Sequence, residues 1–217
     1  MGYRLAIFDL DGTILNTLDD LADSTNAALR MNSLSERTTD EVRRFVGNGI
    51  HLLIERAVPT GTSTELIEKV FADFKAYYGS HCSIKTAPYE GIEELIDSLH
   101  EAGVKVAVVS NKADFAVKEL CAQYFPDKLD FAVGERENIR RKPAPDSVFE
   151  SMKALGVSAD ESVYIGDSDV DIETAKNAGI PCLSVTWGFR DVDFLKAHGA
   201  SRLISTPDEI LSFVTGE

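Results

Sequence analysis

The hydrophobic residues of this chain follow two patterns, short continuous runs and helical stripes. Five runs rich in Val, Ile and Phe each end at Gly, Asp, Ser or Thr, which is typical of buried strands. These runs are residues 4–8, 104–109, 131–133, 162–165 and 182–185. Apolar stripes with the helical period lie between most of them, for example before Gly103 and before Gly156. The alternation predicts an α/β fold with a doubly wound parallel, Rossmann-like sheet.

One long stretch departs from this alternation, because it contains only helical patterns. Thr17 is expected to cap the first of four helices there, and Thr38 with Glu41 is expected to form a capping box at the second. The third helix follows a Gly-Asn-Gly run, and the fourth carries an aromatic stripe. The expected domains are an inserted α-helical cap of residues 16–80 and an α/β core of residues 1–15 and 81–217.

Composition and charge narrow the range of partners. The chain has 217 residues, of which 44% are hydrophobic and 27% charged, so it is expected to fold around one large core. Its formal net charge of -14 repels nucleic acids and anionic membrane surfaces, and we expect neither as a partner. The same charge repels phosphate esters, so a phosphate site in this protein would need a local cation.

The cysteines and the start of the chain bear on location. Cys82, Cys121 and Cys182 are odd in number and widely spaced, which indicates neither a disulfide framework nor a zinc site. The first residues run directly into a strand-like segment, and no long apolar stretch follows anywhere. We therefore expect a cytoplasmic protein; the sequence predicts no oligomeric state.

Two carboxylates lie one residue apart at the end of the first expected strand, Asp9 and Asp11 in the run FDLDGT. Open α/β sheets bind their ligands at this edge. Two like charges so close together are costly unless a cation lies between them or one of them is protonated. Both solutions suit phosphoryl transfer, with a magnesium ion held by one acid and a proton supplied by the other.

Two further runs offer groups that could contact a phosphate. Ser110 and Asn111 come at the end of the second expected strand, where a hydroxyl and backbone amides could hydrogen-bond phosphate oxygens; the alternative is a simple turn and helix cap. Lys142 lies in the run RRKPAPD, whose prolines restrict the direction of its ammonium group. This lysine is either the local cation that the net charge demands or part of a solvated basic loop.

A third acidic run, GDSDVD, follows the fourth expected strand and leads into a helix. Its carboxylate oxygens suit magnesium, and Asp167 is the best ligand because it lies nearest the strand end. Asp171 is expected to bind a metal-bound water or to pair with Lys142. Acids at a helix N-terminus also interact favourably with the helix dipole without any function.

The order of the four motifs is more specific than any one of them. DxDGT, SN, KP and GDSxxD resemble the haloacid dehalogenase-like hydrolase superfamily, with Asp9, Ser110, Lys142 and Asp167 on its motifs. Within it the chain resembles the phosphoglycolate phosphatase group, whose helical cap follows the first motif. TLDDL at 17–21, VRRFVGNG at 42–49 and VTWGFR at 185–190 carry that likeness. Asn16 departs from the pattern, since many relatives have Asp there.

The resemblance implies roles for the acidic residues. Asp9 would be the nucleophile that forms an aspartyl-phosphate, and Asp11 would protonate the leaving alcohol and later activate water. Mg²⁺ would be bound by Asp9, the backbone carbonyl of Asp11 and Asp167. The phosphate-binding residues would be Ser110, Asn111 and Lys142, with Thr13 and Asp171 supporting them.

The substrate and some rival reactions remain open at this stage. Asp11 and Asp167 argue against a dehalogenase, whereas a mutase resembling β-phosphoglucomutase and a non-catalytic phosphate-binding relative stay possible. We expect a small phosphate ester, with 2-phosphoglycolate leading and small sugar phosphates or pyrophosphate as alternatives. Arg44 and Asn48, around the glycine-rich cap loop, are candidates for substrate specificity, with Arg44 contacting a carboxylate.

Overall fold

The chain forms two compact units in a computed structural model that describes residues 2–216. The core unit contains the residues up to Leu15 together with those from Pro88 onward, and the helical unit is Asn16–Ala87. Residues 81–87, which the sequence pattern placed in the core, therefore lie in the helical unit. No helix in the described part of the chain combines the length and the apolar character needed to cross a membrane.

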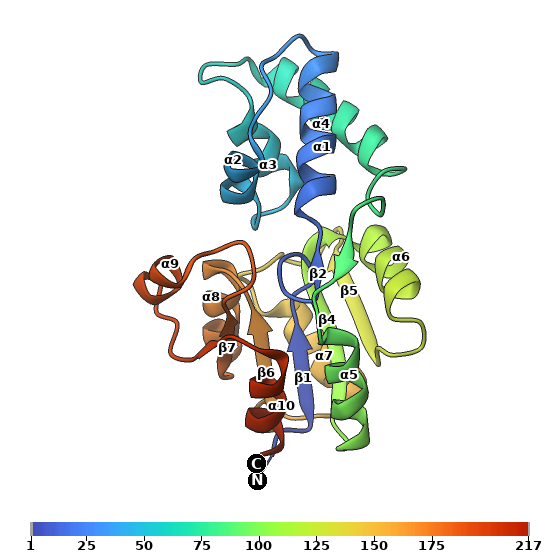
Figure 1. Cartoon of the computed structure of the whole chain (residues 1–217), viewed down its shortest axis with the longest axis vertical. Coiled ribbons are helices and arrows are strands. Elements are labelled where there is room, and N and C mark those ends of the chain that lie inside the picture. Colours follow the sequence, from blue (N-terminus) through green and yellow to red (C-terminus); the bar gives the residue numbers. More distant parts are fainter. Residues whose placement is uncertain (1, 217) are drawn as a thin grey trace. The chain divides into compact units, whose positions relative to one another are not determined.

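The core unit is built on one parallel sheet of six strands in the order β5-β4-β1-β6-β7-β8 (Figure 1). The strands are β1 (Leu5–Phe8), β4 (Lys105–Ala113), β5 (Phe131–Glu135), β6 (Ser162–Gly166), β7 (Cys182–Val185) and β8 (Leu203–Ile204). This sheet confirms the predicted fold class. The sequence pattern missed β8, because two residues are too few to show a hydrophobic run.

Strand β1 is the point at which the strand order reverses. Its last residue, Phe8, is in register with Val108 of β4 on one side and with Ile165 of β6 on the other. The chain then builds the sheet outward in both directions from β1, and folds of this kind bind their ligands at the carboxyl ends of the strands beside such a reversal. Asp9, the residue directly after β1, is thereby placed at the usual ligand site of such a fold.

Helices cover both faces of the sheet, as a doubly wound fold requires. The core helices are α5 (Ile92–Glu101), α6 (Asp114–Tyr124), α7 (Asp146–Leu155), α8 (Asp169–Ala178), α9 (Val192–Ala197) and α10 (Pro207–Thr215), with a short 3₁₀ helix at Ala159–Glu161. Figure 1 shows α5 and α10 in front of the sheet and α7 behind it. Leu5 and Ile7 of β1 pack into one buried cluster with Val148 of α7 and Ala175 of α8.

The helical unit contains the four helices that the sequence pattern predicts: α1 (Leu18–Met31), α2 (Thr39–Phe45), α3 (Ile50–Ala57) and α4 (Thr64–Tyr78). Thr38 and Glu41 form the expected capping box of α2. Thr17 does precede α1, but the expected side-chain cap is wrong: its backbone is not extended, and its side chain makes no capping hydrogen bond to the first turn of the helix. The segments that connect the units, β2 (Leu15–Asn16) and β3 (Ala87–Pro88), pair with each other.

Asp20 explains why residues 81–87 belong with the helices. Its carboxylate is buried in the first turn of α1, where it accepts hydrogen bonds from the backbone N–H groups of Lys85 and Thr86. The Thr86 hydroxyl donates a further hydrogen bond of 2.8 Å to Asp20 Oδ2. These bonds attach the returning segment to α1.

Candidate active site

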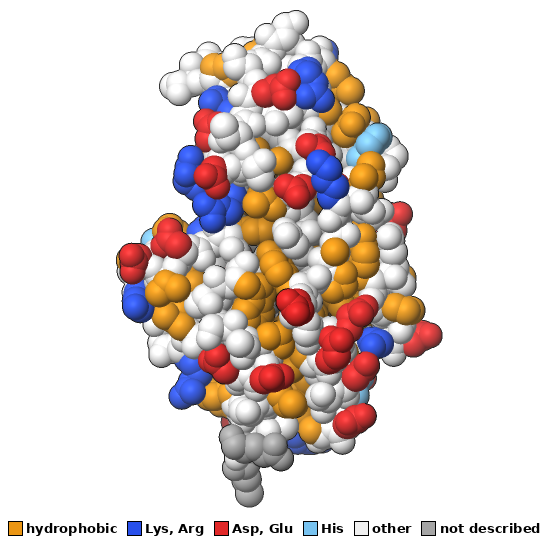
Figure 2. Space-filling view, in the orientation of Figure 1, with side chains coloured by type: hydrophobic (Ala, Val, Ile, Leu, Met, Phe, Trp, Pro, Cys, Tyr) orange, Lys and Arg blue, Asp and Glu red, His pale blue; other side chains and the backbone are white. Residues whose placement is uncertain are grey.

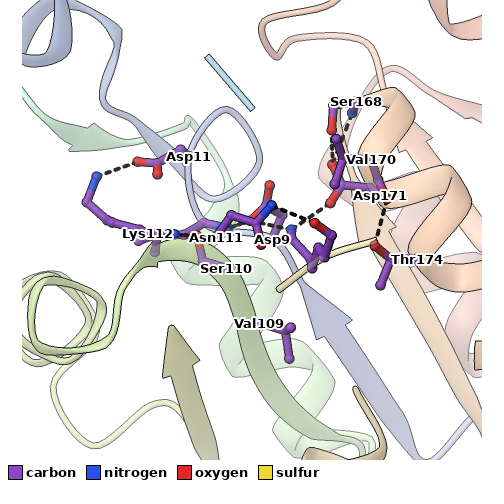
Figure 3. A network of polar contacts seen from close by, with 12 residues as sticks. Asp9, Asp11, Val109, Ser110, Asn111, Lys112, Ser168, Val170, Asp171 and Thr174 are labelled. Atoms are coloured by element: carbon purple, nitrogen blue, oxygen red, sulfur yellow. Dashed lines mark hydrogen bonds and ion pairs between the residues drawn. The ribbon is translucent and has the colours of Figure 1, made fainter. Parts of the chain in front are cut away.

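The predicted motif residues of the core unit meet at the carboxyl ends of β1, β4 and β6. Asp9 follows β1, Ser110 and Asn111 lie in β4, and Asp167 follows β6. Lys142 comes from the loop between β5 and α7. Figure 3 shows Asp9 between the β4 residues and Asp171 of α8. Residues as far apart in sequence as Asp9 and Asp171 therefore form one polar network, because parallel strands end at a common edge.

Lys142 is the centre of this network. Its ammonium lies 2.9 Å from Asp9 Oδ1 and 2.8 Å from Asp171 Oδ1. It also donates to the Tyr164 hydroxyl at 2.9 Å, while that hydroxyl lies 3.2 Å from the Val109 carbonyl. An ammonium has three N–H donors, and each has a partner here. Lys142 is thus a buried, oriented cation rather than part of a solvated loop.

Asp171 uses both of its oxygens to hold other residues. Oδ1 accepts from Lys142, and Oδ2 accepts from the Ser168 backbone N–H and, at 2.6 Å, from the Ser168 hydroxyl. The Ser168 bonds form a capping box at the start of α8. Of the two roles considered from the sequence, the structure therefore places Asp171 in the pair with Lys142.

Asp167 is held by the backbone. Its Oδ2 accepts a hydrogen bond of 2.6 Å from the N–H of Phe189, in the segment after β7. Among the described residues, no donor contacts Asp167 Oδ1 or Asp9 Oδ2, whereas Asp9 Oδ1 accepts from Leu10 N–H and lies beside Lys142. One carboxylate oxygen of Asp9 and one of Asp167 are therefore available to a ligand.

The donor set fits a divalent cation. Asp9, Asp167 and Asp171 are all buried, and one oxygen from each lies within 4.8 Å of the others. Two of these carboxylates, Asp9 and Asp171, share the ammonium of Lys142, so the three acids keep an excess of negative charge that a divalent ion would balance. Oxygen-only ligands are those that Mg²⁺ prefers. Asp9 and Asp167, with their available oxygens, are the residues best able to hold it.

The ionisation of these groups reflects their burial. Burial raises the pKa of Asp9 to about 7, against the opposing effect of Lys142. The pKa of Asp167 is raised well above its usual value by burial and by the charges of Asp171 and Asp9. Burial lowers the pKa of Lys142, but Asp171 and Asp9 outweigh this effect and raise it well above its usual value. A cation at the carboxylates would favour their ionised forms.

Asp11 lies outside this carboxylate cluster. Its Oδ1 accepts a hydrogen bond of 2.9 Å from the ammonium of Lys112, and Figure 3 shows the Asp11 carboxylate directed toward that lysine. Lys112 lies in β4, which continues to Ala113, and its ladder with β5 is irregular between Val109 and Ala113. Such irregularities redirect side chains at functional edges. The alternative of a turn and helix cap at Ser110-Asn111 is therefore wrong, because both residues are strand residues.

The remaining core candidates are all buried. The Ser110 hydroxyl accepts the N–H of Lys112 at 3.2 Å, and Asn111 Nδ2 donates to the Lys142 carbonyl at 3.1 Å. Asn111 thus holds the backbone of the lysine loop. The Thr13 hydroxyl, fully buried after Asp11, has no hydrogen-bond partner within residues 2–216.

Arg44 and Asn48 belong to the helical unit. Arg44 is exposed in the last turn of α2, and Asn48 is partly exposed in the loop before α3. In the described chain neither side chain forms a hydrogen bond. Gly47 and Gly49 on either side of Asn48 have φ values of 121° and 82°, which only glycine adopts easily.

Sequence reasoning assigned no role to three residues of the site, Lys112, Tyr164 and Trp187. Tyr164 gave the clearest signal, since a tyrosine inside an otherwise apolar strand needs a partner for its hydroxyl when buried. Trp187 donates from Nε1 to the Thr13 carbonyl at 3.0 Å. Each of these contacts depends on a partner far away in sequence.

Comparison with known proteins finds one family. The family model described as haloacid dehalogenase-like hydrolase matches residues 6–185. The phosphoglycolate phosphatase of Neisseria meningitidis is 32% identical over 209 residues, which cover 94% of this chain and 87% of the relative. The phosphoglycolate phosphatase of Agrobacterium fabrum is 32% identical over 197 residues, which cover 88% of this chain and 84% of the relative.

Solved structures agree with this likeness. A protein from Lactobacillus delbrueckii subsp. bulgaricus, provisionally assigned as a phosphoglycolate phosphatase, is 39% identical, with a TM-score of 0.96 and coverage of 100% of both chains. A predicted phosphoglycolate phosphatase from Haemophilus somnus is 26% identical, with a TM-score of 0.89 and coverage of 97% of both chains.

Proposed function

Since the chain belongs to the haloacid dehalogenase-like hydrolases, and within them to the phosphoglycolate phosphatase group, we propose that it is a magnesium-dependent phosphatase acting through Asp9 on a small phosphate monoester. The family membership confirms the resemblance seen in the sequence and makes the protein a phosphoric monoester hydrolase. One structural observation supports the proposal most directly. Asp9 lies against the buried cation of Lys142 and beside Asp167, where each acid keeps one oxygen available.

The proposed reaction has two steps. In the first, a carboxylate oxygen of Asp9 attacks phosphorus, the bond between phosphorus and the ester oxygen breaks, and Asp11 gives its proton to the departing oxygen. In the second, Asp11 takes a proton from water, the water oxygen bonds to phosphorus, and the bond from Asp9 to phosphorus breaks. The products are the alcohol and inorganic phosphate, and Asp9 and Asp11 return to their starting states.

The surrounding residues supply positioning and charge. Lys142, already beside Asp9, would stabilise the negative oxygens of the transferring phosphoryl group, and the Ser110 hydroxyl would donate to one of them. Asp9, the Asp11 backbone carbonyl and Asp167 would hold a Mg²⁺ ion, which would supply additional positive charge for phosphoryl transfer. Asn111 would bind the phosphate together with Ser110 and Lys142, and Thr13 and Asp171 would support this arrangement.

Asp11 must leave its partner for this chemistry. Its carboxylate, held as an acceptor by Lys112 at 2.9 Å, has to turn toward the leaving oxygen and carry a proton there. The ion pair therefore represents a resting arrangement of the acid, and substrate binding would compete with it.

For the substrate we favour 2-phosphoglycolate, the compound named by the relatives. The helical unit offers Arg44, Asn48 and the glycine-flanked loop as groups for a carboxylate. Small esters also fit the charge of the protein: on the face in Figure 2, acidic side chains gather over α5, which is unfavourable for polyanions. Three free cysteines fit a reducing compartment such as the cytoplasm.

Phosphate release from a panel of esters tests the proposal. We expect 2-phosphoglycolate to give the highest kcat/KM among 2-phosphoglycolate, small sugar phosphates and pyrophosphate, and Asp9→Asn to abolish turnover on all of them. Activity should be lost with a chelator and restored by Mg²⁺. Isomerisation of a sugar phosphate without release of phosphate would indicate a mutase instead, and substantial activity of Asp9→Asn would remove Asp9 as nucleophile.

Two variants separate the metal site from the phosphate site. Asp167→Ala should regain part of its activity at high Mg²⁺, because it mainly weakens metal binding. Lys142→Ala should not, because the lost charge acts on the phosphoryl group itself. Equal rescue of both variants by Mg²⁺ would contradict the assignment of Lys142.

A further inference from the structure

The segment after β7 contacts the proposed metal ligand Asp167 through its backbone. The N–H of Phe189 donates to Asp167 Oδ2 at 2.6 Å. A backbone amide has a fixed direction, so this bond determines which carboxylate oxygen remains for the metal. Asp167 is 2% exposed, so water offers little alternative to this partner.

Gly188 allows the segment to approach so closely. A Cβ atom at this position would lie 2.3 Å from the Cβ of Asp167 and 2.5 Å from the Gly12 carbonyl oxygen. Any larger residue would have to displace the segment, Asp167 or the loop after Asp11. The Gly188 backbone is therefore packed against both proposed catalytic segments at once.

Trp187 joins the same segment to the loop after Asp11. Its Nε1–H donates to the Thr13 carbonyl at 3.0 Å, and its ring system lies 6.4 Å from that of Tyr89. Thr13 lies two residues after Asp11, and Tyr89 donates its N–H to the Ile14 carbonyl. The segment thus holds Asp167 at one end and the Asp11 loop at the other.

We propose that residues 187–189, here called the 187–189 clamp, are positioning residues for the metal site. The clamp sets the orientation of Asp167 through Phe189 N–H and sets its separation from the Asp11 loop through Gly188 and Trp187. Groups that orient metal ligands in this way commonly contribute 10–100-fold to metal affinity. This inference rests on the proposed role of Asp167 as a metal ligand.

Metal affinity measured by calorimetry with Mg²⁺ tests the clamp on the folded protein. Trp187→Phe keeps an aromatic ring but removes the N–H, and Gly188→Ala introduces the excluded Cβ. We expect each to weaken Mg²⁺ binding about tenfold or more. Ile210→Val in α10 is the control, because it removes a buried methyl group while leaving the clamp intact.

The wild-type protein provides a second measurement that a purely structural role would not produce. Trp187 is the single tryptophan of the chain, so its fluorescence reports on the clamp alone. Mg²⁺ should cause a saturable change in this emission with the midpoint found by calorimetry. The clamp is refuted if Trp187→Phe binds Mg²⁺ within twofold of wild type. If Gly188→Ala does not fold, the Mg²⁺ affinity of Trp187→Phe alone still decides whether the clamp exists.

A further variant distinguishes failure of the clamp from failure of the metal site. If Asp167→Asn loses Mg²⁺ affinity while Trp187→Phe does not, the clamp is wrong and the metal site stands. If Asp167→Asn binds Mg²⁺ as wild type does, both the metal role of Asp167 and the clamp are wrong.

Discussion

The ammonium of Lys112 donates to Asp11 Oδ1 at 2.9 Å, although 101 positions separate the two residues in sequence. The Lys112 side chain is 2% exposed and that of Asp11 is 16% exposed, so the pair is largely removed from water. Buried charges are costly when left alone and tolerated when paired. The pair therefore connects the stability of the core unit to the position of the proposed acid–base residue.

Removing one partner of this pair should destabilise the protein. Lys112→Met is expected to lower the free energy of unfolding by roughly 3 kcal/mol, because Asp11 loses its buried partner. The double variant Asp11→Asn/Lys112→Met should recover part of that loss, since no charge is left unpaired. Urea unfolding measures both. Lys118→Met, which removes an exposed pair with Asp114, should change stability by less than about 0.5 kcal/mol; a similar loss in both single lysine variants would contradict the prediction.

The hydroxyl group of Tyr164 should hold the ammonium of Lys142 in position. Tyr164→Phe deletes the partner of one ammonium N–H and the contact with the Val109 carbonyl. We expect a loss of about 2 kcal/mol in unfolding free energy, the usual scale for a hydrogen bond to a charged group, together with a roughly tenfold lower kcat/KM.

A matched control is available for this substitution. Tyr3 stacks on Phe213, and its hydroxyl has no hydrogen-bond partner among the described residues. Tyr3→Phe should therefore leave stability and kcat/KM nearly unchanged. If both Tyr→Phe variants behave alike, the Tyr164 hydroxyl does not position Lys142.

The stability of the helical unit should depend on the buried carboxylate of Asp20. Asp20→Asn replaces an acceptor-only group by an amide whose NH₂ faces the N–H donors of Lys85 and Thr86. The expected loss is about 2–3 kcal/mol, measured by denaturant unfolding. Asp23→Asn, which affects only the exposed pair with Lys85, should cost less than about 0.5 kcal/mol. Equal effects would mean that the buried carboxylate does not hold residues 85–86.

The thiols of Cys121 and Cys182 should make both thiol labelling and protein stability depend on pH in the alkaline range. Burial raises the pKa of Cys121 and that of Cys182 to about 12. Only the thiolate reacts, so labelling of Cys121 in the folded protein should be slow at pH 8 and accelerate about tenfold per pH unit. In the unfolded chain the same thiols lose their protons at a lower pH than in the folded protein. The two thiols therefore contribute to stability fully below about pH 9, and this contribution decreases as the pH rises toward 12.

Labelling with a thiol reagent, followed by peptide mass spectrometry, measures the reactivity of each cysteine separately. Fully unfolded protein serves as the control, in which all three cysteines should react rapidly at pH 8. Rapid reaction of Cys121 in the folded protein at pH 8 would show that its thiol is not protected.

The sequence by itself determined the sheet class, the four helices of the inserted unit and the four motif residues. These features are local: a buried strand shows as an apolar run, a helix shows as a stripe, and Asp9, Ser110 and Asp167 come at or just after the ends of such runs. Their convergence also followed, because the carboxyl ends of parallel strands meet at one edge of the sheet.

Only the tertiary structure decided which groups pair within that edge. The partners of Lys112, Tyr164 and Trp187 lie on other strands or loops, so they depend on strand order, on register and on the irregular ladder between β4 and β5. The boundary of the helical unit depends in the same way on Asp20 and its partners 65 and 66 positions away. A local pattern carries no information about such distances, since the contacts form only when separate elements have packed.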